Sequence, residues 1–249
     1  MMSLLDLKNK CIVITGAGSG IGRETAIVAS KLGANVVLLD VSEGGLKDTV
    51  SLLSGERYNY FVADLTDNDA IAKIIKEIVD LNGAISGLVH CAGISSRKPL
   101  NVLKRDGFNN VMDINFYAFV EMVKQVTKRG CFADGGSIVV MSSVSSIRGY
   151  KAKTEYCVSK AAVDAFVRCM ALELAPKRIR INSIMPGEVL TPMGIKSREM
   201  AAAAGSSIED APLGPTEPRE VANLIAFLLS DATKTITGTS IRIDGGLCV

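Results

Sequence analysis

Short runs of apolar, β-branched residues alternate along the chain with longer segments whose apolar positions recur at helical spacing. The apolar runs are nearly continuous, which is typical of strands covered on both faces. Alternation of the two kinds of segment indicates βαβ units, which build a parallel sheet through right-handed crossovers. The pattern therefore predicts an α/β fold, a doubly wound parallel sheet (Rossmann fold) of about seven strands with helices on both faces.

We predict strands at Cys11–Thr15, Asn35–Asp40, Tyr58–Ala63, Gly87–Cys91, Ser137–Ser142, Ile179–Met185 and Ser240–Ile243. We predict helices at Ile21–Leu32, Asn68–Asn82, Gly107–Lys128, Glu155–Ala175 and Glu217–Ser230. No linker rich in proline, glycine or serine divides the chain, so we expect one domain over residues 1–249. Thr191–Pro215 is irregular, with a short alanine-rich piece at Met200–Gly205, and we expect a mobile lid over the substrate there.

Composition and charge exclude several classes of function. The 249 residues carry 28 basic and 26 acidic side chains, and this balance gives no electrostatic case for a nucleic-acid partner. No apolar stretch reaches the length of a membrane span, and the amino-terminal residues lack the apolar core of a secretory signal. The six cysteines are dispersed without a CxxC pair, which favours reduced thiols over disulfides or a metal site. We expect a cytoplasmic protein with no membrane partner and no metal.

A glycine-rich turn, Thr15–Gly22, follows the first predicted strand and opens the first predicted helix. Glycines at this place let the backbone turn tightly and approach a pyrophosphate, which then lies at the amino terminus of the helix. The strand before the turn and the helix after it are the context that a dinucleotide-binding loop requires. The residues expected to contact the cofactor here are Gly16, Ser19, Gly20, Ile21 and Gly22.

Asp40 ends the second predicted strand, twenty residues after Gly20. A carboxylate at this position can accept hydrogen bonds from an adenosine ribose, and it would repel a 2′-phosphate. Neither Val41 nor Ser19 offers a positive charge to hold that phosphate. We therefore expect the cofactor to be NAD(H) rather than NADP(H). The alternative role of Asp40 is the N-cap of a following helix, which Ser42 could fill equally well.

Tyr156 and Lys160 stand four residues apart in a predicted helix, so they lie on one face of it. A free phenol titrates near pH ~10 and is a poor base at neutral pH. The positive charge of Lys160 would favour tyrosinate and lower the pKa of Tyr156, as a general acid/base requires. This spacing alone is common on helices, and its weight comes from the surrounding residues.

The motifs above and others along the whole chain occur in the order found in the short-chain dehydrogenase/reductase family. The chain thus resembles the standard form of that family, which has roughly 250 residues. Thr15–Gly22 is similar to the family's cofactor loop, and Asp244-Gly245-Gly246 to its carboxyl-terminal signature. Thirteen residues separate Ser143 from Tyr156, as the family pattern requires. The further cofactor contacts that the resemblance implies are Asp64, Leu65, Ala92, Gly93, Tyr156, Lys160, Pro186, Gly187, Val189 and Thr191.

The resemblance also implies a catalytic tetrad of Asn115, Ser143, Tyr156 and Lys160. The reaction of that family is hydride transfer between a nicotinamide and a carbon that bears a hydroxyl or carbonyl group. Tyr156 would exchange the hydroxyl proton, and Ser143 would hydrogen-bond the substrate oxygen. Lys160 would also hold the nicotinamide ribose, and Asn115 would hold a water that links Lys160 to solvent.

One motif departs from the family pattern. Where the family has Asn-Asn-Ala-Gly, this chain has His90-Cys91-Ala92-Gly93, which removes the polar contacts of the two asparagines. Because Ala92 and Gly93 are present, we expect the backbone to keep its course past the cofactor. His90 is then expected to be a structural hydrogen-bonding residue rather than a catalytic one.

The substrate is expected over the nicotinamide, between residues 95–99, residues 145–155 and the lid. Candidate contacts are Ser95, Ser145, Tyr150 and Glu188. Glu188 would bind substrate hydroxyls or a cation, or else face solvent, and Tyr150 would cover an apolar substrate. The helix Glu155–Ala175 is apolar nearly all round, which suggests a subunit interface. The resemblance implies a homotetramer through this helix and its neighbour, Gly107–Lys128, with a dimer as the second expectation.

Three functions fit these residues. The first is an NAD-dependent oxidoreductase of a secondary alcohol, such as a polyol, sugar, hydroxy acid or hydroxysteroid. The second is a 3-oxoacyl-(acyl-carrier-protein) reductase, which would normally use NADPH and a basic surface. Asp40 argues against NADPH and Leu172 against that surface, while Lys128 and Arg129 leave it open. The third, a non-catalytic NAD(H)-binding scaffold or sensor, is disfavoured because the tetrad is whole.

Overall fold

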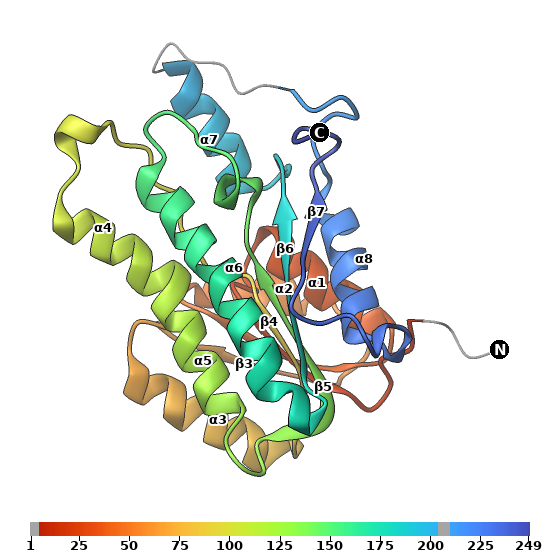
Figure 1. Cartoon of the computed structure of the whole chain (residues 1–249). Coiled ribbons are helices and arrows are strands. Elements are labelled where there is room, and N and C mark those ends of the chain that lie inside the picture. Colours follow the sequence, from red (N-terminus) through yellow and green to blue (C-terminus); the bar gives the residue numbers. More distant parts are fainter. Residues whose placement is uncertain (1–4, 204–209) are drawn as a thin grey trace.

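The computed structural model describes residues 5–203 and 210–249, and within them seven parallel strands form one sheet in the order β3-β2-β1-β4-β5-β6-β7. The strands are β1 Cys11–Thr15, β2 Asn35–Asp40, β3 Tyr58–Val62, β4 Ile85–His90, β5 Phe132–Met141, β6 Arg180–Pro186 and β7 Ser240–Ile243. The helices are α1 Gly20–Lys31, α2 Glu43–Val50, α3 Asn68–Asn82, α4 Arg105–Met112, α5 Ala118–Val126, α6 Thr154–Leu174, α7 Pro192–Ala203 and α8 Pro218–Leu229. The predicted doubly wound α/β fold is confirmed (Figure 1).

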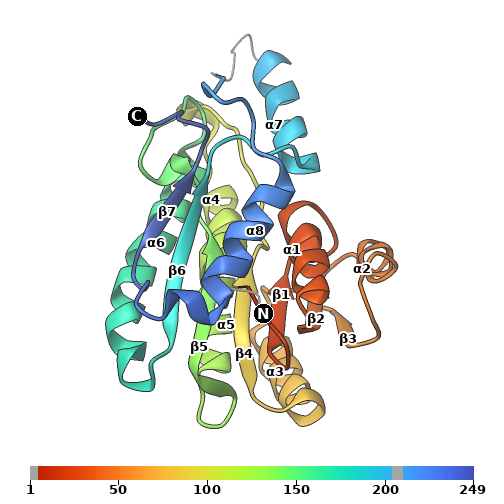
Figure 2. The ribbon, with the colours of Figure 1, turned by 90° about the vertical axis from the view of Figure 1, so that its right-hand side faces the viewer.

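Helices cover both faces of the sheet (Figures 1 and 2). Alternate residues of a strand point to opposite faces, so β1 contributes Val13 to one core and Ile12 and Ile14 to the other. The first core is completed by α3, α5 and α6, with Phe119 of α5 fully buried. The second is completed by α1, α2 and α8. This double coverage explains why the central strands are continuous apolar runs.

The strand order reverses at β1, which pairs with β2 on one side and β4 on the other. In an open parallel sheet the crevice at such a switch point, outside the carboxyl ends of the strands, is where ligands bind. In both views α7 lies beyond this edge of the sheet (Figures 1 and 2). The topology therefore places the glycine-rich turn after β1 beside the segment that follows β4.

Two predicted segments differ from the structure, and one helix of the structure was not predicted. The helix predicted at Gly107–Lys128 consists of α4, a π-helical turn at Asp113–Tyr117, and α5. The segment predicted as irregular, Thr191–Pro215, contains the twelve-residue helix α7. The alanine-rich piece Met200–Gly205 lies in α7 up to Ala203. Its last two residues and the middle of the expected lid fall within 204–209, outside the described residues. Helix α2 was not predicted, although Ser42 does cap it by accepting a hydrogen bond from Gly45 N at 3.1 Å.

The other boundaries shift by a few residues at an end, most at β5, which begins five residues earlier than predicted. Across residues 5–203 and 210–249, no helix combines the length and the apolar character needed to cross a membrane.

Candidate active site

A cavity of about 470 Å³ lies at the carboxyl ends of the strands. Its lining comes from the segments that follow β1 to β6, with additions from α6, α7 and the chain end at Leu247. All the residues predicted to contact the cofactor line this cavity, and so do the predicted substrate contacts Ser95, Ser145, Tyr150 and Glu188. Of the predicted tetrad, Ser143, Tyr156 and Lys160 line it, whereas Asn115 is buried behind the lining.

The glycine-rich turn packs so closely that side chains would not fit. Gly16 has a φ of +65°, and a Cβ there would lie 2.8 Å from Ala92 N. A Cβ on Gly22 would lie 2.2 Å from Gly16 O. The turn therefore brings bare backbone to the cavity at the start of α1, whose N-cap residue Ser19 makes no side-chain hydrogen bond to the helix. Free amides at a helix amino terminus suit a phosphate group.

Asp40 lies at the end of β2, against this turn. Its carboxylate accepts hydrogen bonds from Gly18 N and Ser42 N, each at 2.9 Å. A carboxylate has about four lone-pair positions, so capacity is left for ribose hydroxyls. Asp40 therefore fixes the turn as well as facing the cavity, and Ser42, not Asp40, is the N-cap of α2.

His90, which stands where the family resembled above has an asparagine, is buried where β4 ends. Its Nδ1 lies 3.1 Å from the Thr15 hydroxyl, which in turn accepts a hydrogen bond from Ala92 N at 3.2 Å. His90 thus ties β1 to the segment after β4, as expected of a structural hydrogen-bonding residue. Burial, with a smaller contribution from the charge of Lys160, lowers the pKa of His90 to about 3, so the ring is neutral at physiological pH.

Tyr156, in the first turn of α6, makes a hydrogen bond with Ser143 from the segment after β5. Burial raises the pKa of Tyr156 to about 12, and the Ser143 hydrogen bond only partly opposes this. The expectation that the pKa of Tyr156 is lowered towards neutral pH is therefore wrong for the structure described. Burial is the larger effect, and the Lys160 ammonium lies 5.6 Å from the centre of the Tyr156 ring.

Lys160 is buried one helical turn beyond Tyr156, and its ammonium donates a hydrogen bond to Met141 O at 2.8 Å. Burial lowers the pKa of Lys160 to about 8, opposed by the nearby Cys91 and Asp164. At neutral pH the side chain thus remains mostly cationic. It supplies a fixed positive charge between the tyrosine and the place where the strands β4 and β5 end.

Asn115 lies in the π-helical turn, a feature that often marks functional positions in helices. Its side-chain amide makes three hydrogen bonds, two with the backbone N and O of Ile94 and one with Ser159 Oγ. Asn115 therefore holds the segment after β4 against α6. A Cβ on Gly93 would lie 3.1 Å from Asn115 Oδ1 and 3.6 Å from Lys160 Nζ, so Asn115 and Lys160 converge on that glycine.

Glu188 lines the cavity, and its side chain is only 13% exposed, so it does not face solvent. Arg198 of α7 holds both of its carboxylate oxygens, with Nε 2.7 Å from Oε1. The lining also contains two cations that the sequence interpretation did not single out, Arg97 and Lys153. They fall inside the segments expected around the substrate, 95–99 and 145–155, but no periodicity distinguishes them from solvated loop residues.

These residues fit a nicotinamide dinucleotide. The glycine turn and the start of α1 would hold the pyrophosphate, Asp40 the adenosine ribose, and Lys160 the nicotinamide ribose. The fit follows from the glycine cradle, which a Cβ at position 16 or 22 would fill. When bound, the cofactor supplies or accepts the hydride. Within residues 5–203 and 210–249, no three His, Cys, Asp or Glu side chains are grouped so that they could hold a metal.

Comparison with known proteins gives matches over nearly the whole chain. A family model described as enoyl-(acyl carrier protein) reductase matches residues 16–248. The 3-oxoacyl-(acyl-carrier-protein) reductase FabG of Thermotoga maritima is 35% identical, over 98% of this chain and 99% of its own length. The NAD-dependent glycerol dehydrogenase of Listeria innocua is 33% identical, over 98% of this chain and 96% of its own length.

Among solved structures, a dehydrogenase/reductase from Sinorhizobium meliloti is similar over 100% of this chain and 99% of its own, with a TM-score of 0.89 and 30% identity. The sequence relatives and the structural neighbour thus agree on the same fold and the same general chemistry.

Proposed function

The chain belongs to the short-chain dehydrogenase/reductase family, whose members are oxidoreductases acting on CH–OH groups, and we propose that it interconverts a secondary alcohol and a ketone with NAD(H). The observation that carries the proposal is the presence of Ser143, Tyr156 and Lys160 in the same cavity as the glycine turn and Asp40. A hydride donor and a proton donor can therefore act on one substrate.

In reduction, Ser143 hydrogen-bonds the carbonyl oxygen and Tyr156 donates a proton to it as negative charge develops there. Burial keeps the Tyr156 phenol protonated at neutral pH, which suits the donating role. The nearby Lys160 cation stabilises the tyrosinate that the transfer leaves behind. Asn115 positions these groups by fixing the segment after β4 against α6.

The choice of NAD(H) rests on the charges along the cavity. Asp40 and Asp64 lie in the part lined by the glycine turn, and the cations of the described lining are Arg97, Lys153 and Lys160. Arg97 and Lys153 belong to the loops around Tyr156, away from Asp40. Arg23 is hydrogen-bonded to Gly18 O and Gly45 O and does not line the cavity. No cation of the described lining therefore lies beside Asp40 to hold a 2′-phosphate. The name of the glycerol dehydrogenase relative, which specifies NAD, supports the same choice.

The proposal is tested by following NADH and NADPH oxidation with a panel of ketones and a 3-oxoacyl thioester, with Tyr156→Phe as the inactive control. We expect NADH-linked reduction of a ketone that falls by a factor of about 100 or more in the variant, since the proton donor is removed. Failure of every ketone with both nucleotides, while NADH still binds, would overturn the proposal.

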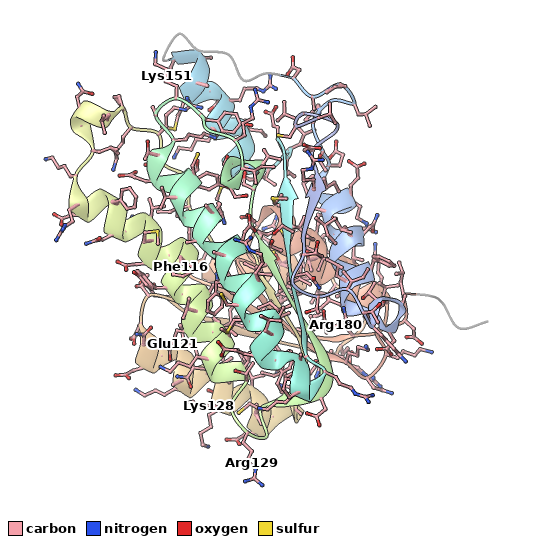
Figure 3. All side chains as sticks on the ribbon, viewed as in Figure 1. Phe116, Glu121, Lys128, Arg129, Lys151 and Arg180 are labelled. Atoms are coloured by element: carbon pink, nitrogen blue, oxygen red, sulfur yellow. The ribbon has the colours of Figure 1, made fainter. Side chains whose placement is uncertain are left out.

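A 3-oxoacyl-(acyl-carrier-protein) reductase is the second candidate, because the FabG relative is 35% identical over nearly the whole chain. Two features disfavour it. Leu172, on α6, is 79% exposed at a place where such reductases would carry a basic residue. Lys128 and Arg129 precede β5 and lie at the end of the molecule opposite the cavity (Figure 3). Thioester turnover with NADPH would favour this candidate.

We retain a homotetramer, with a dimer second, and a cytoplasmic location as proposals. Val158 and Leu172 are exposed apolar residues on α6, as expected of a helix that packs against a second subunit. The cysteines of the chain are free, which suits a reducing compartment. Light scattering on the purified protein measures the assembly directly, and a monomer would contradict the tetramer.

A further inference from the structure

Two cations from different loops meet at the substrate side of the cavity. Lys153, in the turn before α6, has its ammonium 5.7 Å from the centre of the Tyr156 ring and 5.8 Å from that of Tyr150. Arg97, from the segment after β4, also lines the cavity. The two charges are close enough that Arg97, after burial, contributes to lowering the pKa of Lys153. Two like charges held close together repel each other, so each disfavours the charged form of the other.

Neither cation has an ion-pair partner within the described residues. Lys153 has two aromatic neighbours there but no hydrogen-bond acceptor and no carboxylate within ion-pair distance. Arg97 donates from Nη1 to Lys151 O at 3.3 Å, while its Nε is buried without an acceptor in residues 5–203 and 210–249. A buried guanidinium nitrogen without a partner is costly unless a ligand supplies one.

The nearest acid on the cavity wall is already engaged. Glu188 is held by the Arg198 guanidinium through both carboxylate oxygens, and Arg198 also contacts Asp210 at 2.7 Å. Glu188, Arg198 and Asp210 together carry one net negative charge. Glu188 attracts the Lys153 ammonium and raises its pKa, although less than burial and Arg97 lower it. Against the two charges of Arg97 and Lys153, one positive charge is therefore left.

The backbone holds the two cations as one unit. Lys98 N donates to Ala152 O at 2.7 Å, which joins the segment of Arg97 to the turn that carries Lys153. The buried Glu155 holds the same segment through Ser96 Oγ and, at 3.7 Å, through Lys98 Nζ. Ala152 adopts a φ of +63°, a conformation that non-glycine residues rarely take and that is found at ligand sites where the surroundings fix it.

We propose that the substrate is an anionic ketone, an oxo acid or a phosphorylated ketone, whose carboxylate or phosphate binds Lys153 and Arg97 while its carbonyl meets Ser143 and Tyr156. This inference rests on the proposed function and adds the substrate class to it. Arginine and lysine together offer several N–H donors to such a group, and the surrounding cavity wall strengthens the attraction by excluding water.

The test compares ketones that are matched except for charge, with NADH as reductant. The pairs are 3-oxobutanoate with 3-oxobutanamide, 4-oxopentanoate with 4-oxopentanamide, and dihydroxyacetone phosphate with dihydroxyacetone. We expect the kcat/KM of at least one anion to exceed that of its neutral partner by about ten- to hundredfold, the range of a charge-assisted hydrogen bond. A preference among the acids assigns a carboxylate, and a preference for the phosphate assigns a phosphate.

Lys153→Met and Arg97→Met should each reduce the ratio of anion to neutral kcat/KM by about tenfold or more. Lys151→Met is the matched control, because Lys151 is an exposed lysine two residues away that does not line the cavity (Figure 3). It should leave the ratio unchanged. NADH binding by fluorescence shows that each variant retains its fold.

Two results would overturn the inference while leaving the proposed function intact. One is equal turnover of the anion and the neutral partner by the unmodified protein. The other is an equal loss of kcat for both partners in Lys153→Met, because Lys153 would then act on Tyr156 and not on the substrate anion. Absence of turnover for every ketone, charged or neutral, would instead refute the proposed function itself.

Discussion

The single histidine of this chain provides a quantitative test of the structure. His90 is 1% exposed, lies 5.2 Å from the ring of Phe119, and has no hydrogen-bond partner for its Nε2 among the described residues. Burial, and then the charge of Lys160, lowers its pKa from 6.5 to about 3. The folded protein should therefore keep this ring neutral at pH 5.5, where an unfolded chain would protonate it.

The sign and size of the effect follow from this difference. Because the folded-state pKa lies below the unfolded one, the unfolded chain binds the extra proton, and stability falls as pH decreases from 6.5 towards 3. Between pH 7.0 and pH 5.5 His90 alone should lower the free energy of unfolding by about 1.3 kcal/mol. The result depends almost entirely on the unfolded pKa, since any folded value well below 5.5 gives the same figure.

The perturbation is His90→Asn, which removes the titrating group, and the assay is guanidinium denaturation at both pH values and a fixed protein concentration. Carboxylates titrate equally in both proteins, so the difference between them isolates the imidazole. The pH-dependent loss of stability should be about 1.3 kcal/mol smaller in the variant, whatever its stability at pH 7.0. An identical loss in the two proteins would mean that the folded protein protonates His90 normally, and would refute the burial argument.

Two further substitutions test the cofactor site. Asp40→Asn removes the charge but keeps an acceptor. The ratio of kcat/KM for NADH to that for NADPH should therefore fall by about five- to thousandfold, as expected for removing a repulsion of about 1 to 4 kcal/mol. An unchanged ratio would mean that Asp40 does not select the cofactor. Gly22→Ala would place a Cβ 2.2 Å from Gly16 O, so we expect a loss of about 1 to 3 kcal/mol in stability and weaker NADH binding by calorimetry. Gly44→Ala is its control, since a Cβ there meets nothing within 4 Å, and equal effects of the two would contradict the packing argument.

Much of the fold could be predicted because its signals are local. The bounds of β1, β2, β7 and α3 agree with the prediction, since each combines one clear periodicity with polar or glycine residues at its ends. Helix α2 was missed because Gly44 and Gly45 lower helix propensity. Its stability comes instead from burial of Leu46 and from Thr49 Oγ1, which donates to Ala17 O at 2.8 Å, and neither contact is visible in the local sequence.

Helix α7 was missed for a related reason. It begins at Pro192 and contains Gly194, which together suggest a loop. Proline is favoured in the first turn of a helix, however, and the Thr191 hydroxyl accepts a hydrogen bond from Gly194 N at 3.1 Å. The same residues that suggested a lid therefore start a helix.

In the site, too, residues on regular elements could be predicted and residues on loops could not. Tyr156 and Lys160 could be placed together from helical spacing alone, whereas Arg97 and Lys153 could not, because they meet through loops with no repeating pattern. The irregular features at this edge of the sheet include the π-helical turn at Asn115 and the positive φ of Ala152. Each is held by side-chain or backbone hydrogen bonds to a different loop, and such strained conformations persist only where packing fixes them. The regular elements thus place Tyr156 and Lys160 in the same cavity as the glycine turn, and the irregular ones place the two cations that we propose bind the substrate.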